Sequence, residues 1–213
     1  MDFQEFLKYI PKIAKEKGIG EEAHEKMMPP ERIALFKGLD LNTVNARKAC
    51  VMMLFYPKNN EPYLILIVRN SYKGVHSSQI GFPGGKVEDF DISLEDTALR
   101  ETFEEIGIER EKINIVRPFT EIYIPPSNFK VYPFLGYATE ELTFIPNDRE
   151  VFGLIELPLS VLLDDKNLVS KTLSTSYMEE VGVPAFKFEE HYIWGATSQM
   201  LNELKEVIKR VLK

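Results

Sequence analysis

The segment Gly84–Ile108, "GGKVEDFDISLEDTALRETFEEIGI", joins a glycine pair to a short stretch that is rich in carboxylates. Pro83 and the two glycines predict a rigid turn whose backbone lies open to close approach. Ser93 is a plausible N-cap with Asp96 three residues later, and Gly107 is a typical helix stop. The segment therefore predicts a glycine turn followed by a helix over about 93–106.

The predicted helix carries three glutamates, which share an arc of about 100° when successive residues are placed 100° apart. These glutamates are Glu101, Glu104 and Glu105. The opposite face is predicted to be apolar and to consist of Leu99, Phe103 and Ile106. Most glutamate runs are solvated helix faces, because like charges repel little in open water. In a cleft the same cluster is costly unless a cation lies among its oxygens.

The glycine turn favours the cation. Glycine lets the backbone approach a metal closely and offers a carbonyl ligand. Ligands that are all oxygen suit a hard cation, Mg²⁺ or Mn²⁺. Such ions on carboxylates serve phosphoryl and pyrophosphoryl transfer, in which they neutralise developing charge.

Composition limits the other possibilities. The chain has 213 residues with 44% hydrophobic and 28% charged content, which is enough for one ordinary globular core. A net charge of −7 argues against a nucleic-acid partner. Cys50 stands alone in an apolar run, so we expect a buried strand position. The N-terminal stretch is unlike a signal peptide, and no apolar run approaches the roughly 18 residues of a membrane span. These features predict a cytoplasmic protein with no membrane partner.

Hydrophobic periodicity predicts the remaining elements. We expect helices over 2–17, interrupted at Pro11, over 156–164 and over 196–212. We expect a short helix and then an extended turn within 21–33. Strands are predicted at 49–56, 63–69, 113–123, 129–139 and 183–193. The result is an α/β protein in which a helical extension, residues 1–45, packs on a core domain, residues 46–213.

The opening segment resembles the Nudix box, the signature of hydrolases of nucleoside diphosphates linked to another moiety. The matching positions are Gly85, Arg100, Glu101, Glu104, Glu105, Gly107 and Ile108. The loop between the glycine and the arginine is one residue longer than is usual, which makes Asp91 its acid. The resemblance implies a Nudix α/β/α sandwich with a mixed β-sheet.

The resemblance also implies roles for single residues. The metal ligands would be Glu101, Glu105, Glu104 and the carbonyl of Gly85. The catalytic set would be Glu101, Glu104, Arg100 and Glu150. Arg100 would orient a glutamate, and the base for the attacking water would be Glu101 or Glu150. A surface acid is the alternative for Glu150.

Flanking segments look like the coenzyme A diphosphatase branch of this family, among them "IVRNSYKGVHSSQIGFPGGKV" before the box and "PPSNFKVYPFLGY" after it. The implied reaction cleaves coenzyme A or a derivative into 3′,5′-ADP and 4′-phosphopantetheine. Arg69 fits the first arginine of the branch signature. Gly74 stands at its second arginine and Ser78 at its glycine, which puts the substrate in question more than the reaction.

Candidate substrate contacts follow from the same segments. They are Arg69, His76, Phe82, Gly84, Ser127 and Asn128; His76 is as readily a structural hydrogen-bonding residue. The expected partner is a small nucleotide resembling coenzyme A. The alternatives are a Nudix enzyme for ADP-ribose, NADH or a nucleoside triphosphate, and a Nudix-like module that senses a nucleotide without hydrolysing it. The sequence allows a homodimer and does not decide the oligomeric state.

Overall fold

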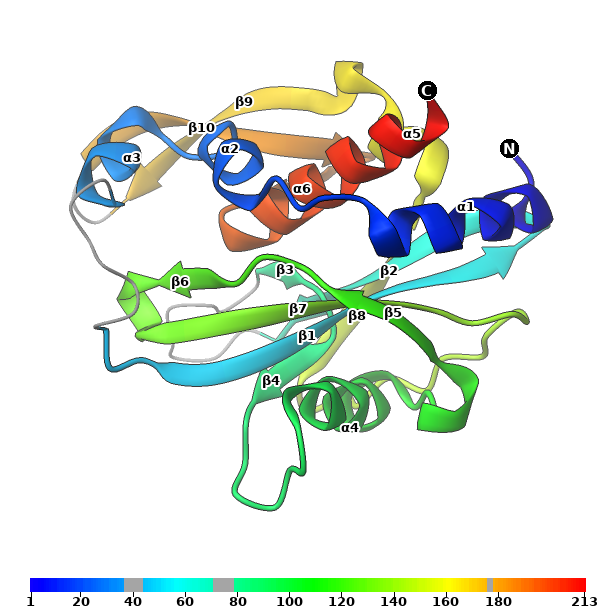
Figure 1. Ribbon diagram of the computed structural model, residues 1–213. Helices are drawn as coiled ribbons and strands as arrows, with labels where there is room; N and C mark the ends of the chain where they lie inside the picture. The colour runs from blue at the N-terminus through cyan, green and yellow to red at the C-terminus, as the bar shows by residue number, and fades with distance from the viewer. Residues whose placement is uncertain (37–43, 71–78, 176–177) are drawn as a thin grey trace.

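The computed structural model describes residues 1–36, 44–70, 79–175 and 178–213, and its centre is a mixed sheet (Figure 1). Eight strands of the described chain form this sheet: β1 (Arg47–Lys58), β2 (Glu61–Arg69), β3 (Ile80–Gly81), β4 (Gly84–Lys86), β5 (Asn114–Pro118), β6 (Ile122–Ile124), β7 (Phe129–Tyr137) and β8 (Val151–Pro158). The order is β3-β2-β1-β7-β5, while β4 pairs with β1, β6 with β7 and β8 with β2. The β1–β7 pair is parallel and β1 is antiparallel to β2 and β4, so the predicted mixed sheet is confirmed.

Helices cover both faces of this sheet. They are α1 (Phe3–Lys15), α2 (Gly20–Glu25), α3 (Pro30–Phe36), α4 (Leu94–Ile106), α5 (Leu159–Leu163) and α6 (Ala196–Leu212). Three single turns, η1 (Arg110–Lys112), η2 (Pro125–Ser127) and η3 (Asp165–Asn167), complete the helical segments. In Figure 1, α4 lies below the sheet, whereas α1, α2 and α6 lie above it. None of the helices in the described residues is both long enough and apolar enough to cross a bilayer.

The central strand β1 is buried on both faces, which explains its nearly continuous apolar sequence. Met53 and Phe55 belong to the core that α1 and α6 cover. Met52 and Leu54 belong to the core on the other side, together with Ala98 of α4. Alternate residues of one strand thus fill two separate cores, as the period of a strand requires.

A second, antiparallel sheet lies beyond the upper helices. Its strands are β9 (Leu168–Thr175), β10 (Met178–Phe188) and β11 (His191–Trp194), in the order β11-β10-β9. The strand predicted at 183–193 is therefore wrong in form, because it is a hairpin. Its turn residue Glu189 has a φ of 52°, so no glycine marked the reversal. The sequence also gave no sign of β9 or of β8.

Three other predictions need correction. The segment 21–33 forms two helices, α2 and α3, instead of one helix and an extended turn. The strand predicted at 113–123 is divided into β5 and β6, with a register shift between Ile115 and Arg117. The helix predicted at 156–164 begins as strand β8 and becomes helical after Pro158. The helices predicted at 2–17, 93–106 and 196–212 are confirmed within a few residues, and α1 continues through Pro11.

The N-terminal helices are part of the packing. Phe6 and Ile13 of α1 are fully buried in the upper core. Asn202 of α6 donates to the carbonyl of Ala23 at 2.7 Å, which fixes α2. Residues 1–36 thus include helices that pack on the rest of the chain, and the division into an extension, residues 1–45, and a core domain stays a prediction.

Candidate active site

The helix α4 is fixed at both ends by the residues that the sequence indicated. The Ser93 hydroxyl accepts a hydrogen bond from the Asp96 N–H at 3.0 Å. Gly107 is left-handed, with a φ of 74°, and its N–H donates to the Phe103 carbonyl at 2.9 Å. Both caps satisfy backbone groups that the helix leaves unpaired, so the side chains of α4 are held on a rigid element.

The buried face of α4 differs from the prediction. Phe103 is 53% exposed, whereas Glu105 is 1% exposed. Ala98 and Thr102 are fully buried, and α4 contacts β1 and β4. Small side chains on the inner face leave room for a glutamate between the helix and the glycines of β4. The glutamates therefore do not share one open face.

Glu105 is enclosed by β2 and β4. Its Oε2 accepts from the Gly84 N–H at 2.7 Å, and its Oε1 accepts from Arg69 Nη1 at 2.9 Å. Burial raises the pKa of Glu105 to about 7, although Arg69 and the Gly84 N–H oppose the rise. The charges of Glu101 and Glu150 raise this pKa further. A carboxylate buried beside other carboxylates is a feature of functional sites.

Glu101 lies against Gly85. A side chain at position 85 would place its Cβ 2.4 Å from Glu101 Oε2, closer than any real contact. Gly85 pairs with Cys50 in the sheet, so the glycine leaves a hollow between β4 and α4 that the carboxylate enters. Burial raises the pKa of Glu101, which the adjacent Arg100 opposes. The glycine is required here for space.

Arg100 organises the outer part of the site. Its Nε and Nη2 donate to the two oxygens of Asp91 at 2.8 and 2.9 Å. Its Nη1 donates to Glu101 at 2.7 Å and to Glu104 at 3.1 Å. The hydrogen bonds from Arg100 hold the pKa of Asp91 well below its usual range. These contacts agree with the predicted orienting role of Arg100 and make Asp91 the acid that anchors the long loop.

Glu150 comes from the loop before β8. The backbone of this loop is tied to α4, because the Asn147 N–H donates to the Glu105 carbonyl at 2.9 Å. The Asn70 N–H, after β2, donates to the Glu150 carbonyl at 2.9 Å. The charge of Glu150 raises the pKa of both Glu101 and Glu105, so its carboxylate shares their neighbourhood. Asn147 and its turn are a part of the site that no sequence signal revealed.

The donor set fits a hard divalent cation by its chemistry. Four carboxylates, those of Asp91, Glu101, Glu104 and Glu105, pair with two guanidinium groups, those of Arg69 and Arg100, and the charge of Glu150 acts on Glu101 and Glu105 as well. Negative charge is therefore in excess, and it is partly desolvated. Gly85 of β4 lies against Glu101, so its backbone carbonyl is a further candidate oxygen ligand. Oxygen ligands with excess negative charge are what Mg²⁺ and Mn²⁺ require.

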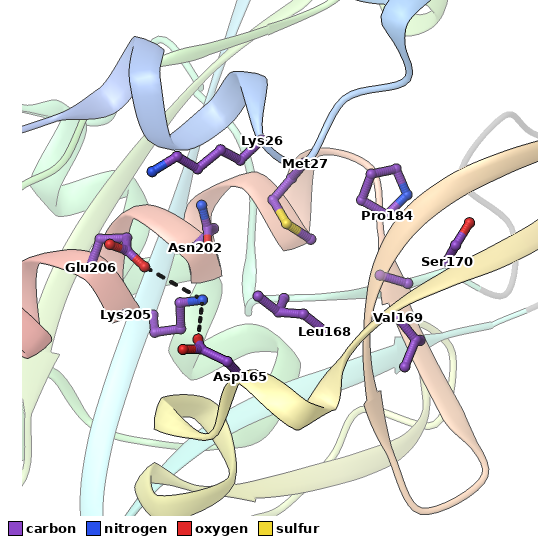
Figure 2. A pocket seen from close by; sticks show the side chains of 11 residues that line it. Lys26, Met27, Asp165, Leu168, Val169, Ser170, Pro184, Asn202, Lys205 and Glu206 are labelled. Carbon is purple, nitrogen blue, oxygen red and sulfur yellow. Dashed lines mark hydrogen bonds and ion pairs between the residues drawn. The ribbon is translucent and has the colours of Figure 1, made fainter.

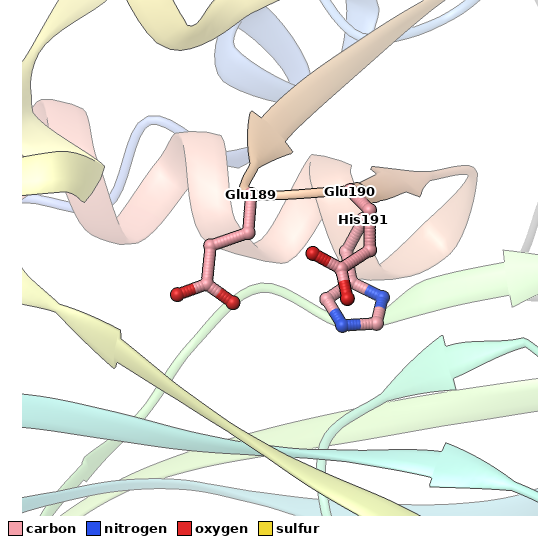
Figure 3. A group of neighbouring side chains, drawn as sticks. All are labelled: Glu189, Glu190 and His191. Atoms are coloured by element: carbon pink, nitrogen blue, oxygen red, sulfur yellow. The ribbon is translucent and has the colours of Figure 1, made fainter.

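The glutamates do not form a closed cluster. Among the described residues, one group of three possible metal ligands (His, Cys, Asp or Glu) has all its ligand atoms within 4.8 Å of one another. It consists of Glu189, Glu190 and His191 (Figure 3). These three are consecutive at the β10–β11 turn, and chain adjacency alone explains their closeness. On α4, Arg100 pairs with Glu101 and Glu104, while Arg69 pairs with Glu105.

The predicted substrate contacts divide into three groups. Phe82 is 1% exposed in the upper core, so its side chain has a packing role, which corrects the prediction. Gly84 has a φ of 152°, and a Cβ there would lie 2.2 Å from the Cys50 carbonyl, so its contacts are also internal. Arg69 binds Glu105 and the Gly84 carbonyl. His76, Gly74 and Ser78 lie outside the described residues.

Ser127 and Asn128 lie at the turn before β7. The Ser127 carbonyl accepts from Arg47 Nη2 at 2.8 Å, and Asn128 Oδ1 accepts from the Tyr123 hydroxyl at 3.0 Å. On β1, Arg47 pairs with Phe129 and Cys50 pairs with Gly85. Arg47 and Cys50 are three residues apart, which is roughly 10 Å along the strand. The two residues are thus apart from the glutamates, at a separation that an extended nucleotide spans.

A separate hollow of about 420 Å³ lies on the other side of the sheet, between α2, α6 and the second sheet (Figure 2). Lys205 projects into it and pairs with Asp165 at 3.1 Å and with Glu206 at 3.5 Å. The remaining lining is largely apolar and includes Met27, Leu168 and Pro184. Because the charge of Lys205 is balanced by its own neighbours, we assign no chemistry to this hollow.

The sequence and the fold are both similar to those of known proteins. A family model described as the NUDIX domain matches residues 46–174. An uncharacterized Nudix hydrolase, NudL, from Yersinia enterocolitica is 32% identical over 70% of this chain and 75% of its own length. A Nudix hydrolase from M. smegmatis, RenU, is 16% identical with a TM-score of 0.54, covering 78% and 87% of the two chains. The NUDIX domain of Shewanella oneidensis NrtR, solved in complex with ADP ribose, is also 16% identical, with a TM-score of 0.50, covering 84% and 98%.

Proposed function

Because the chain belongs to the Nudix hydrolase family, we propose that it is a metal-dependent diphosphatase that cleaves coenzyme A or its derivatives into 3′,5′-ADP and 4′-phosphopantetheine. The observation that carries the reaction type is the placement of Glu101 in the hollow at Gly85, beside the buried Glu105. A solvated glutamate face would need neither the glycine nor the burial.

The residues divide the work as follows. Glu101, Glu104, Glu105 and the Gly85 carbonyl would hold Mg²⁺ or Mn²⁺. When bound, the ion supplies positive charge that neutralises the diphosphate. Arg100 orients Glu101 and Glu104 through its pairs with both. Glu150, or Glu101, accepts the proton of the water that attacks phosphorus.

Support for coenzyme A comes from the resemblance of the flanking segments to that branch. Two observations reduce the expected number of contacts to coenzyme A, and they keep ADP-ribose, NADH or a nucleoside triphosphate as the alternative substrate. Gly74 replaces an arginine of the branch signature. Arg69, the other signature arginine, donates to Glu105 and to the Gly84 carbonyl. We therefore expect coenzyme A to be cleaved with a high KM and a largely preserved kcat.

A substrate panel tests the proposal. Hydrolysis of coenzyme A, dephospho-coenzyme A, ADP-ribose and a nucleoside triphosphate is compared on one Mn²⁺-supplemented preparation, with products identified by mass spectrometry. A lost charge-assisted hydrogen bond is worth roughly 1.5–3 kcal/mol, or about ten- to a hundred-and-fifty-fold in affinity. Coenzyme A should nevertheless give the highest kcat/KM.

The other results are equally informative. If ADP-ribose or a nucleoside triphosphate exceeds coenzyme A by more than about tenfold in kcat/KM, the coenzyme A proposal fails and the hydrolase remains. If the folded protein binds a nucleotide but hydrolyses none of the panel, the proposed diphosphatase activity is wrong and a nucleotide-sensing module takes its place.

A further inference from the structure

Arg69 is the residue whose position differs most from its expected task. We infer that Arg69 is a positioning residue that holds Glu105 for the metal, and that it is not a contact for the substrate. The inference rests on the proposed metal-dependent hydrolysis and is independent of which nucleotide is cleaved.

Arg69, Glu105 and Gly84 form a closed set of hydrogen bonds across three elements. Arg69 Nη1 donates to Glu105 Oε1 at 2.9 Å, and Arg69 Nη2 donates to the Gly84 carbonyl at 2.6 Å. The Gly84 N–H donates to Glu105 Oε2 at 2.7 Å. Both oxygens of the carboxylate are therefore engaged, and the rotamer of Glu105 is tied to β2 and β4 at once.

The backbone directs Arg69 toward α4. Ile65 and Ile67 of β2 belong to the core that α4 covers. Arg69 comes two residues after Ile67, so its side chain leaves the strand on the same face. The register with β8 shifts between Val68 and Arg69, and the Arg69 N–H donates to the Gln79 carbonyl at 3.0 Å. The end of the strand is thus fixed, and the side chain leaves it toward Glu105.

Burial raises the energetic cost of breaking the Arg69–Glu105 pair. Glu105 is 1% exposed on its side chain and Arg69 is 25% exposed. Removing one partner of a buried pair leaves the other charge without compensation, which is far more costly than losing a surface pair. Two of the five N–H donors of Arg69, one on each terminal nitrogen, already serve protein acceptors, so the protein itself fixes the position of this guanidinium.

The matched control is a second arginine–carboxylate pair on the same helix. Arg110 pairs with Asp96 at the outer side of α4, where Arg110 is 48% exposed on its side chain. Arg110 belongs to η1, so Arg110→Gln removes an arginine that pairs with a carboxylate of α4 without touching the glutamates of the site. It should leave both metal affinity and turnover unchanged.

The experiment measures Mn²⁺ affinity by electron paramagnetic resonance, without any nucleotide, together with kcat and KM. Arg69→Gln should weaken Mn²⁺ binding by about 10- to 100-fold, the usual cost of losing a residue that orients a metal ligand, and lower kcat with little change in KM. Arg69→Lys, which keeps the charge but not the fork, should fall between the wild type and Arg69→Gln. Thermal unfolding confirms that each variant is folded.

A double variant separates positioning from general destabilisation. In a Glu105→Gln background the carboxylate is already absent, so adding Arg69→Gln should change Mn²⁺ affinity by less than about twofold. Additive losses would overturn the inference, as would a KM raised tenfold at unchanged kcat and unchanged Mn²⁺ affinity. If Arg69→Gln does not fold, Arg69→Lys carries the same comparison. A wild-type protein that binds no Mn²⁺ would refute the proposed function itself, whereas normal Mn²⁺ binding by Arg69→Gln would refute only this inference.

Discussion

Two buried glutamates lie on opposite sides of the sheet, and they differ in what surrounds them. Glu203 of α6 is fully buried, 3.1 Å from His24 Nε2, and accepts from the Thr120 hydroxyl at 2.7 Å. Burial acts to raise its pKa, but the hydrogen bonds from His24 and Thr120 outweigh burial, and the pKa is lowered. Glu105 is equally buried, yet its pKa is raised to about 7.

The difference separates a structural carboxylate, Glu203, from the proposed metal ligand, Glu105. Glu203 is bound by His24 and by the N–H and hydroxyl of Thr120, so its carboxylate joins α2, the segment before β6 and α6. Glu105 has two donors and is surrounded by Glu101 and Glu150, whose charges oppose its own. Negative charge that the protein leaves uncompensated is available to a cation.

The largest expected effect is on activity at Glu105. Glu105→Gln should lower kcat by at least about a hundredfold, because a ligand is replaced by a neutral amide. Its unfolding temperature should fall, because Arg69 loses its charged partner, but the variant should stay folded, since the amide can still accept from the Gly84 N–H. Near-full activity of a folded Glu105→Gln would mean that Glu105, like Glu203, has only a structural role.

Gly85→Ala sharpens the same side of the comparison. The new Cβ would meet Glu101 Oε2 at 2.4 Å, so the carboxylate must move. A displacement of this size costs about a hundredfold in kcat in well-ordered sites. Gly153→Ala is the control, because nothing lies within 4 Å of its added Cβ. Steady-state kinetics on both variants decide the matter, and equal activities would show that Glu101 needs no hollow.

Glu203→Gln should show the converse. It weakens the contacts to His24 and Thr120, and we expect a loss of about 1–3 kcal/mol in the free energy of unfolding. The kcat of the folded protein should stay within about twofold of the wild type, because α6 and α4 are separated by the sheet (Figure 1). Urea denaturation with activity measured in parallel tests both parts, and a kcat loss without destabilisation would contradict them.

The smallest effect is a dependence on pH. The pKa of Glu203 is lowered on folding, so its stabilisation is complete above the unfolded value of about 4.3 and is lost as the pH falls through the folded value. The difference in unfolding free energy between wild type and Glu203→Gln should therefore shrink below about pH 4. Denaturation curves at several pH values give this difference, and one that grows with acid would show the sign to be wrong.

Local signals predicted the local features of the site. Ser93, Gly107 and the glycine pair fix α4 and its approach to β4 through neighbours in the chain, so a short segment was sufficient. The family resemblance then gave the fold class and membership of the Nudix hydrolases, both of which the comparisons bear out.

The sequence did not predict the contacts between residues that are far apart in the chain. The pair of His24 and Glu203 joins positions 179 residues apart, and Arg69 meets Glu105 across 36. Periodicity assigned Phe103 and Ile106 to the core; Ile106 is buried as predicted, but Phe103 is exposed and Glu105 is buried in its place. The turn of the β10–β11 hairpin, at Glu189, contains no glycine or proline, so residue propensities could not reveal it.

Metal dependence tests the central claim most directly. Turnover of coenzyme A is followed by product identification in excess chelator, and then after Mg²⁺ or Mn²⁺ is restored. The excess of carboxylates over guanidinium groups predicts that turnover vanishes in chelator and returns with the ion, giving 3′,5′-ADP and 4′-phosphopantetheine. Unchanged turnover in chelator would contradict the account, because the glutamates of α4 would then act without the cation that their arrangement requires.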